Sequence, residues 1–536
     1  MVALNAWWRE AARISSANSF LVAAWLASVG LPAGFAADPI DKEAAAAVQL
    51  GRTLFAHQWS ANDARSHGGD GLGPVFNAAS CVACHEQGGI GGAGPLEANV
   101  QVLSRMGQWK LGELRKVHIG LVDQPHVVLH KSGPSEYGRW HKQRLALAHA
   151  TPQRSTTKPE AELSAAEKNL RNGMRRQIAV LSGNADAGAE ELEDDSPALV
   201  VHKSKRGKGT TPVSFQKSAP GQKPRELRGI VASDRSTTSL FGVGLIDAID
   251  DATIEQVARD EMQLFPKVAG RVSRLADKKV GRFGWHAQMA NLREFTLTAC
   301  AVEVGLEVPG HPQAGNPLQP DYRPHGFDMN RAECDALVAY IAQLPRPVEK
   351  SHPRPTVVDQ GRDLFDKVGC ADCHRPDLGA VSGLYSDLLL HDMGPDLQAG
   401  KYGAFTPLGD PQGDAAEVPA DADKKKLVEA VVDRTKDLLW RTPPLWGVAS
   451  SAPYLHDGRA ETLAEAIKLH AGQGQDSADK FAELKAEERQ SLLTFLSTLI
   501  APPTAEQLPR GGGMGWGRIN NMPRNIVGGG GGGGMF

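Results

Sequence analysis

Apolar positions recur along this 536-residue chain with the spacing of amphipathic helices and, in one region, with the residue types of strands. The clearest helical pattern comes late, where Leu463, Ile467 and His470 fall on one face of a helix. Valine-rich segments at 127–129 and 199–201 contain the β-branched residues that favour strands. The pattern therefore predicts a mainly α-helical protein with some β-structure in its first half.

The two ends of the chain have their own patterns. An apolar stretch from Phe20 to about Val29 is followed by small residues at 34–37 that suit cleavage by signal peptidase. We expect residues 1–36 to be a signal peptide, with an uncleaved anchor as the alternative. The glycine-rich segment 504–536 has little to bury, and we expect it to be a disordered tail.

Short sequence landmarks occur twice and in the same order, which indicates an internal repeat. GRTLF at 51–55 corresponds to GRDLF at 361–365. Further on, LFGV at 240–243 corresponds to LWGV at 445–448. Helical segments follow each landmark, so the repeat predicts two related helical domains of the cytochrome c type.

We expect the N-terminal domain at about 45–345 and the C-terminal domain at about 350–500, joined by a proline-rich linker. The first is much longer because it contains an insertion at about 98–230. An acidic run at 190–195 and a basic run at 203–208 indicate solvated loops within this insertion. The fold class is thus two helical domains with an inserted region of loops and strands.

Charge and cysteine content narrow the chemistry. A net charge of -3 gives no sign of a nucleic-acid partner. Four of the six cysteines lie in two C-x-x-C-H motifs, at 81–85 and 370–374. In such a motif the two thiols add to the vinyl groups of a haem and the histidine binds the iron. The residues concerned are Cys81, Cys84, His85, Cys370, Cys373 and His374.

Two copies of the motif predict two covalently bound c-type haems, with His85 and His374 as iron ligands. Because this type of haem is attached outside the cytoplasm, the motifs agree with the predicted leader and place the protein in the periplasm or another extracytoplasmic space. The two remaining cysteines, Cys300 and Cys334, either form a disulfide or are separate buried residues.

Longer motifs resemble those of the bacterial di-haem cytochrome c peroxidases and MauG-type enzymes, and most closely the branch called di-haem oxidoreductases. The motifs are LFGVGLIDAI at 240–249, GRFGW at 281–285, YSDLLLHDMGP at 385–395 and RTPPLWGVASSAPYLHDGR at 441–459. The resemblance covers roughly residues 45–500, apart from much of the insertion.

The resemblance implies that hydrogen peroxide is reduced at the N-terminal haem and that electrons enter through the C-terminal haem. A tryptophan couples the two haems in this family, and Trp285 matches it. A glutamate serves as the distal acid/base, and Glu303, eighteen residues after Trp285, is similar in position. Glu307 is the alternative.

For the C-terminal iron the resemblance implies a sixth ligand about fourteen residues after the histidine of the PY-x-H motif. That histidine is His456, so His470 is the expected ligand, and Met393 is the rival. A calcium ion often lies between the two domains in this family, held partly by backbone oxygens, and Ser451 and Pro453 look similar to those positions.

The N-terminal iron departs from the family pattern, because Gln101 stands where family peroxidases often have a displaceable histidine. Either this iron is five-coordinate and open to peroxide, or one of His118, His126 and His130 reaches back from the insertion.

The sequence thus predicts an exported di-haem oxidoreductase, peroxidase-type in the first hypothesis. Its partners would be hydrogen peroxide or another oxidant, and a small periplasmic electron-donor protein. In a second hypothesis the oxidised haem pair modifies a partner protein, as in MauG-like enzymes. In a third, the protein is an electron-transfer cytochrome without catalysis.

Overall fold

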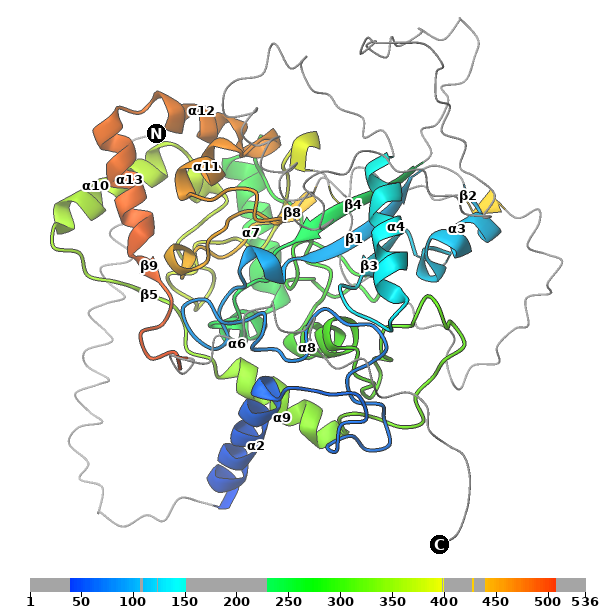
Figure 1. Ribbon diagram of the computed structural model, residues 1–536. Helices are drawn as coiled ribbons and strands as arrows, with labels where there is room; N and C mark the ends of the chain where they lie inside the picture. The colour runs from blue at the N-terminus through cyan, green and yellow to red at the C-terminus, as the bar shows by residue number, and fades with distance from the viewer. Residues whose placement is uncertain are drawn as a thin grey trace, which may run out of the picture.

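The computed structural model describes residues 39–106, 109–122, 124–150, 229–397, 399, 427–428 and 439–507. The predicted signal peptide, the predicted strand at 199–201 and most of the glycine-rich tail lie outside the described residues. Within the described ranges, helices predominate and strands form small sheets (Figure 1). None of the helices in these ranges combines the length and the apolar character needed to cross a membrane.

The α-helices are α2 (Pro39–Ala56), α3 (Leu111–Val117), α4 (Tyr137–Ala150), α6 (Val243–Asp247), α7 (Asp251–Leu264), α8 (Leu292–Ala299), α9 (Arg331–Ala342), α10 (Pro355–Lys367), α11 (Leu463–Lys468), α12 (Gln475–Glu483) and α13 (Ala486–Thr498). Short helical turns are η1 (Leu96–Ala98), η2 (Ile119–Leu121), the π-helical turn η4 (Cys300–Val304), η5 (Cys370–Asp372), η6 (Pro395–Leu397), η9 (Val448–Ser450) and η10 (Gly472–Gly474).

Local sequence fixes where several of these helices begin. Asn330 caps α9 and Thr462 caps α11, and in each case a glutamate three residues later returns a hydrogen bond to the cap, which completes a capping box. Helix α10 begins with Pro355, whose missing N–H costs nothing in the first turn.

Each half of the repeat is closed by a helix pair that joins its beginning to its end: α2 packs on α9, and α10 packs on α13 (Figure 1). Gly51 and Gly361 occupy the two crossings. A Cβ atom on Gly51 would lie 2.0 Å from the carbonyl oxygen of Ala336, and one on Gly361 would lie 2.1 Å from that of Ser491. The glycine that opens each repeat is therefore required by close helix contact.

A second pair of landmarks also has equivalent roles. Gly242 and Gly447 adopt left-handed backbone conformations, with φ of 73° and 75°, and each is the N-cap of a short helix, α6 or η9. The predicted domain boundaries at 45–345 and 350–500 stay predictions.

The inserted region contributes an antiparallel sheet in the order β3-β1-β4, formed by β1 (Val100–Met106), β3 (His126–Leu129) and β4 (Gly229–Arg235). Strand β3 contains the predicted strand at 127–129, and all four of its residues are buried. In the register, Val102 lies opposite Val128 on one side and Ser233 on the other. Strand β4 returns the chain to the second landmark, so the sheet covers the N-terminal half.

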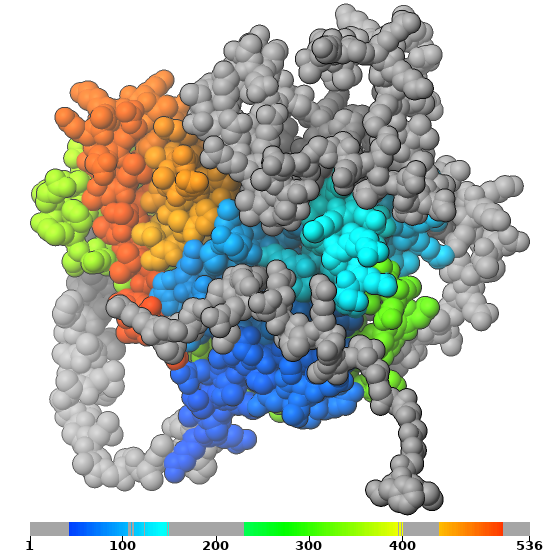
Figure 2. Space-filling model, in the orientation of Figure 1, coloured from blue at the N-terminus to red at the C-terminus, as the bar shows by residue number. Residues whose placement is uncertain are grey.

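Three two-stranded ladders complete the described strands. They are β2 (Trp109–Lys110) with β7 (Leu427–Val428), β5 (Val348–Glu349) with β9 (Leu499–Ile500), and β6 (Leu390–Asp392) with β8 (Leu439–Arg441). The β5–β9 ladder ties the linker to the end of the C-terminal half. Figure 2 shows α4 and the C-terminal helices on opposite sides of one face.

The largest apolar cluster takes side chains from both halves of the repeat. It includes Phe55 and Leu337 from the N-terminal half and Leu388 and Trp446 from the C-terminal half. Burial of these groups away from water holds the two halves together as one core.

The first residues of the segment assigned to the tail are packed on the N-terminal half. At 504–507 the chain passes α2: Ala505 is 6% exposed and joins the apolar cluster, and Glu506 pairs with Arg52. The segment from residue 504 to residue 507, predicted as the start of a disordered tail, is therefore packed, because Ala505 covers apolar surface.

Candidate functional site

The histidine of the N-terminal motif is held by the backbone. The Nδ1 of His85 lies 3.0 Å from the carbonyl oxygen of Gly92. A ring nitrogen facing a carbonyl must carry the proton, so Nε2 is left with its lone pair for a metal. Burial lowers the pKa of His85 to about 4, which keeps the ring neutral, as ligation requires.

The histidine of the C-terminal motif is held by a backbone carbonyl in the same way. Cys370 begins the short turn η5 and Cys373 is its C-cap, and the Nδ1 of His374 lies 3.0 Å from the carbonyl oxygen of Tyr385. Burial, followed by the charge of His470, lowers the pKa of His374 to about 4. Both motifs thus present a neutral histidine with Nε2 available for iron.

A cavity of about 300 Å³ adjoins the C-terminal motif, a size typical of the smaller ligand sites. Its lining includes Trp285, Cys370, Cys373, His374, Met393, Trp440, His456 and His470, with Ala93, Thr237 and Thr238 from the N-terminal half. The backbone of Thr238 also interacts with His85. The cavity therefore extends from the second motif to the surroundings of the histidine of the first, and its lining fits a haem bound at Cys370 and Cys373.

Both candidates for the sixth ligand of the C-terminal iron line this cavity. The Nδ1 of His470 lies 2.7 Å from the carbonyl oxygen of Ala466, so its Nε2 is the nitrogen free to bind a metal. Met393 lies beside it: a Cβ atom on Gly474 would be 3.3 Å from the ring of His470 and 3.4 Å from the methyl carbon of Met393. His470 and Met393 thus lie side by side in the cavity, and the choice of His470 as the ligand stays a prediction.

Trp285 also lines the cavity, between the second motif and the N-terminal half. Its Nε1 donates a hydrogen bond to the carbonyl oxygen of Ser236, at 3.0 Å. The backbone of Trp285 is held by strand β8, because the N–H of Arg441 donates a hydrogen bond to the carbonyl oxygen of Trp285 at 2.9 Å. The ring is thus fixed by both halves of the repeat.

A stack of aromatic rings beside Trp285 was not predicted from the sequence. Trp440 lies between His286 and His456, with ring centroids 4.1 and 3.9 Å away and interplanar angles of 29° and 20°. Trp285 meets Trp440 and His456 edge-on at 6.5 and 6.4 Å. The only sequence signal for Trp440 is its place one residue before the motif at 441–459.

Glu303 lies against the segment that leads into the N-terminal motif. Its Oε2 accepts a hydrogen bond from the Nδ2 of Asn77 at 2.7 Å, and its carbonyl oxygen accepts from the backbone of Asn77 and Ala78. Burial, followed by the charge of Glu303, raises the pKa of Cys84 to about 12. Glu303 belongs to the π-helical turn η4, a rare element that often marks functional sites.

Glu307 faces a different group of side chains. Its Oε2 accepts a hydrogen bond from the backbone of Gln313 at 2.8 Å, and its charge acts on Asp328 and Asp70. The geometry therefore favours Glu303 over Glu307 as the carboxylate beside the first motif.

Of the three histidines named in the insertion, His130 lies nearest to Glu303. Its Nε2 lies 2.8 Å from the carbonyl oxygen of Val302, the residue before Glu303. His126 instead contacts the Oγ of Ser104 within the sheet.

His118 and Gln101 lie apart from this contact. His118 packs on Trp140, with ring centroids 5.6 Å apart. Gln101 lies in β1 and forms a side-chain hydrogen bond with Asp234. A ligand to the first iron from one of these three histidines stays a prediction.

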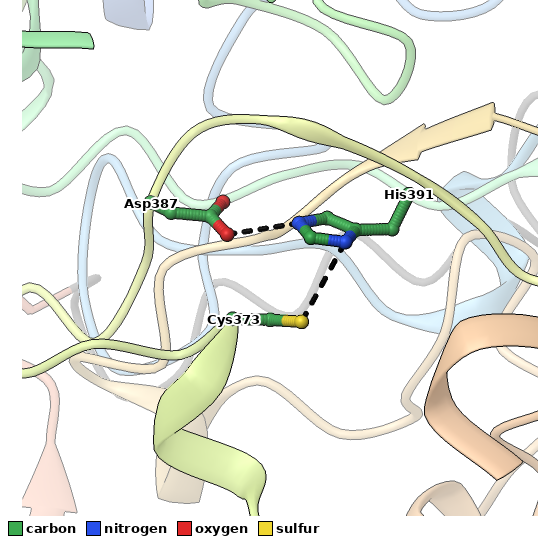
Figure 3. Close-up of side chains that lie close together, drawn as sticks. All are labelled: Cys373, Asp387 and His391. Atoms are coloured by element: carbon green, nitrogen blue, oxygen red, sulfur yellow. Dashed lines mark hydrogen bonds and ion pairs between the residues drawn. The ribbon is translucent and has the colours of Figure 1, made fainter. Parts of the chain in front are cut away.

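A second group that was not predicted includes one cysteine of the second motif. Cys373, Asp387 and His391 bring three potential ligand atoms within 4.8 Å of one another, and they are the one such group of three found in the described ranges (Figure 3). Asp387 and His391 are four residues apart inside the motif at 385–395, which was the only sequence signal for the pair.

The remaining predicted residues have simple surroundings. Cys300 and Cys334 are separate free cysteines, 3% and 0% exposed, so they are buried apolar residues rather than a disulfide. Ser451 and Pro453 line the cavity, and the Oγ of Ser451 donates to the carbonyl oxygen of Val448. The calcium ion stays a prediction.

Comparison with known proteins identifies the family. A family model described as "Di-haem oxidoreductase, putative peroxidase" matches residues 428–499. Hydrazine synthase subunit gamma of Kuenenia stuttgartiensis is 29% identical over 188 residues, and the methylamine utilization protein MauG of Methylorubrum extorquens is 28% identical over 158 residues. These partial matches support a place for this chain in the di-haem cytochrome c peroxidase and MauG superfamily. Membership implies haem cofactors, which agrees with the two histidine sites.

The superfamily matches are partial. They cover 33% of this chain and 51% of the hydrazine synthase subunit, and 28% of this chain and 36% of MauG. The chain thus spans about half of the first relative and about a third of the second.

Two solved structures are also similar to this chain. A MauG-like protein associated with microbial copper homeostasis is 20% identical, with a TM-score of 0.23, over 48% of this chain and 92% of that one. Hydrazine synthase of Kuenenia stuttgartiensis is 18% identical, with a TM-score of 0.22, over 55% and 100%. Since both TM-scores are low, the superfamily assignment rests on the sequence matches.

Proposed function

We propose that this protein is an exported di-haem c-type oxidoreductase of the peroxidase type. Hydrogen peroxide would be reduced at the N-terminal motif, and electrons from a small extracytoplasmic donor protein would enter at the C-terminal motif. Each peroxide consumes two electrons and two protons and yields two molecules of water. Bound haem iron would supply the redox chemistry.

The residues that carry the proposal are those around the two motifs. His85 and His374 each present a neutral Nε2 because a backbone carbonyl holds Nδ1. Thioether bonds from the paired cysteines would fix the haems against these histidines. The single observation that supports a peroxidase is the position of Glu303, a carboxylate bonded to Asn77 and close enough to Cys84 to raise the pKa of its thiol.

Glu303 would move protons at the N-terminal site. Its carboxylate would take the proton from one oxygen of peroxide and return it to the other, which then leaves as water. The hydrogen bond from Asn77 orients the carboxylate for this transfer. Trp285, fixed at its Nε1 and at its backbone, would provide the aromatic contact between the two sites.

Low-temperature EPR of the ferric protein, followed by a peroxide titration, tests the proposal. We expect a high-spin signal that disappears as peroxide is added, beside a low-spin signal from the C-terminal iron. Two low-spin signals that peroxide leaves unchanged, even after reduction by one electron, would exclude a peroxidase and leave an electron-transfer cytochrome.

A MauG-like activity is the second candidate, in which the oxidised haem pair removes electrons from a partner protein. Two features favour it: a histidine, His470, is the expected sixth ligand, and MauG is among the relatives. A histidine ligand gives a lower reduction potential than methionine and so stabilises the oxidised iron. Consumption of peroxide without any added electron donor, with covalent change in a partner protein, would distinguish this candidate.

Export and covalent attachment can be tested together. The leader at 1–36 and the two C-x-x-C-H motifs support a mature protein in the periplasm that carries two c-type haems. We expect the N-terminal sequence of the mature protein to begin near Asp38, and a haem stain to remain with the protein on a denaturing gel.

A further inference from the structure

A buried histidine stands between a motif cysteine and a carboxylate in the C-terminal half (Figure 3). The Nδ1 of His391 lies 3.6 Å from the Sγ of Cys373, and its Nε2 lies 2.8 Å from the Oδ2 of Asp387. The two ring nitrogens face opposite partners, so a single metal ion could not bind the sulfur, the ring and the carboxylate together. The geometry is that of a hydrogen-bonded chain rather than of a metal site.

The surrounding backbone fixes this chain in place. The Oδ1 of Asp387 accepts a hydrogen bond from the N–H of Leu389 at 2.7 Å. Gly270 closes over the ring, since a Cβ atom there would lie 2.7 Å from the Nε2 of His391. The N–H of Gly270 in turn donates to the Oε2 of Glu261 at 2.9 Å. Residues from α7 and from the loop after it therefore hold His391 against Cys373.

The charges on the chain follow from its burial and its partners. Burial lowers the pKa of His391, but the charge of Asp387 and the hydrogen bonds to Asp387 and Cys373 outweigh it and raise this pKa well above its ordinary value. Burial raises the pKa of Asp387, but the charge and the hydrogen bond of His391 lower it overall. Burial and the charge of Asp387 raise the pKa of Glu261 to about 8, which favours its uncharged form. The shifts of His391 and Asp387 both favour the charged forms of that pair.

Haem attachment makes the charged form of His391 the better partner for the sulfur. When the thiol of Cys373 adds to a vinyl group, a carbon–sulfur bond forms, the S–H bond breaks, and the hydrogen goes to the other vinyl carbon. The sulfur can then only accept a hydrogen bond. If the ring of His391 were neutral and donated from Nε2 to Asp387, its Nδ1 would point a lone pair at this sulfur, and no hydrogen bond would form there. The charged ring carries a proton on both nitrogens and can donate to both the carboxylate and the sulfur.

We propose that His391, held by Asp387, is a positioning residue that donates a hydrogen bond to the thioether sulfur of Cys373 and raises the reduction potential of the C-terminal haem. The potential would rise because the ring of His391, rather than the carboxylate behind it, contacts the sulfur of Cys373, and a positive charge at this contact favours the iron state with one more electron. The inference rests on the proposed function only in requiring a haem bound at Cys370 and Cys373.

The first motif has different neighbours. The charged groups that act on Cys84 are Glu303, Lys131 and Glu86. Within the described ranges, no histidine hydrogen-bonds to Cys84 as His391 does to Cys373. The pair at His391 would therefore act on one haem and leave the other unchanged, and this selectivity is what an experiment can measure.

Redox titration of the holoprotein, followed by absorption and EPR, tests the proposal with Asp387→Asn and His391→Gln. We expect each variant to lower the ratio of ferrous to ferric C-terminal haem about tenfold at a fixed ambient potential, a shift of ~59 mV for a one-electron couple. The N-terminal haem should be unchanged. His67→Gln is the matched control, because it breaks another histidine–carboxylate pair, 2.7 Å from Glu333, in the N-terminal half.

The outcomes separate this proposal from the proposed function. An unchanged C-terminal potential in both variants, with two thioether-bound haems present in the pyridine haemochrome spectrum, overturns the positioning role. An equal shift at both haems, or the same shift in the control, also overturns it, because it would reflect a general structural change. A selective shift in a protein that does not react with peroxide supports the positioning role and refutes only the peroxidase. A chain without haem at Cys370 and Cys373 refutes both.

Discussion

Glu303→Gln tests the acid/base group of the proposed peroxidase. Glutamine has the shape of glutamate, and its carbonyl oxygen can still accept the hydrogen bond that the Nδ2 of Asn77 now donates at 2.7 Å. The change replaces a charge-assisted hydrogen bond with a neutral one, which costs about 1 kcal/mol of stability. The packing of the η4 turn should be retained, so the variant should fold and bind both haems.

The expected loss of activity is much larger than the loss of stability. A positioned acid/base group contributes roughly 10²- to 10⁴-fold to the rate. At 1.36 kcal/mol for each factor of ten, this corresponds to ~2.7–5.4 kcal/mol of transition-state stabilisation. We expect kcat/KM for peroxide to fall by that factor, while the EPR signals of the ferric protein stay as in the wild type.

Glu307→Gln is the matched control, because it is the same chemical change four residues away. Its carboxylate accepts a hydrogen bond from Gln313 and lies near Asp70 and Asp328 rather than near Cys84. Stopped-flow measurement of peroxide reduction with an artificial one-electron donor compares the two variants. A loss confined to Glu307→Gln would assign the role to Glu307, and full activity in both variants would refute a glutamate acid/base at this site.

Three further predictions concern stability and ligation. Gly361→Ala should lower the free energy of unfolding by about 1–3 kcal/mol, because the new methyl group collides with the crossing helix. The control is Gly138→Ala, which is also in a helix but has no neighbouring atom within 4 Å, and it should be neutral or stabilising by up to about 1 kcal/mol. Urea unfolding that ranks the two variants in the opposite order would contradict the reasoning. His470→Ala should abolish the low-spin EPR signal of the C-terminal iron, whereas Met393→Ala should leave it; the reverse result would make methionine the ligand. Burial lowers the pKa of His118 to about 3, so protonation of this histidine in the unfolded chain below pH 6.5 favours unfolding. Urea unfolding at pH 7 and at pH 5 should show a loss of stability that is about 2 kcal/mol smaller in His118→Gln than in the wild type. Equal losses in the two proteins would show that folding does not keep this ring neutral.

The features that could be predicted from the sequence are those fixed by short-range covalent or backbone requirements. The C-x-x-C-H spacing reflects the distance between two vinyl groups, so it can be read without a fold. In the sequence, Gly51 and Gly361 were recognised only as equivalent positions of the repeat. The structure explains them, because each lies at a helix crossing that leaves no room for a side chain. The strand at 127–129 followed from its β-branched residues, since all of β3 is buried.

The features that could not be predicted depend on contacts between distant segments. Strand β1 pairs with β4, although residues 107–228 separate them in sequence, and no local pattern encodes that pairing. Trp440 stacks between His286 and His456, which are far apart along the chain, and hydrophobic spacing says nothing about such a stack. His391 and Asp387 are close in sequence, but Cys373 becomes their partner only through folding.

The two motifs show how a repeat can acquire different roles in its two halves. Each half has the same two backbone features, a carbonyl that orients the motif histidine and a glycine at a helix crossing. The groups around the second cysteine of each motif differ: a carboxylate from η4 acts on Cys84, and His391 from the β6 segment contacts Cys373. A negative neighbour favours the ferric iron and a positive neighbour favours the ferrous iron. On the proposal made for His391, a difference in a few side chains would separate the reduction potentials of two otherwise similar sites and would give electrons a direction between them.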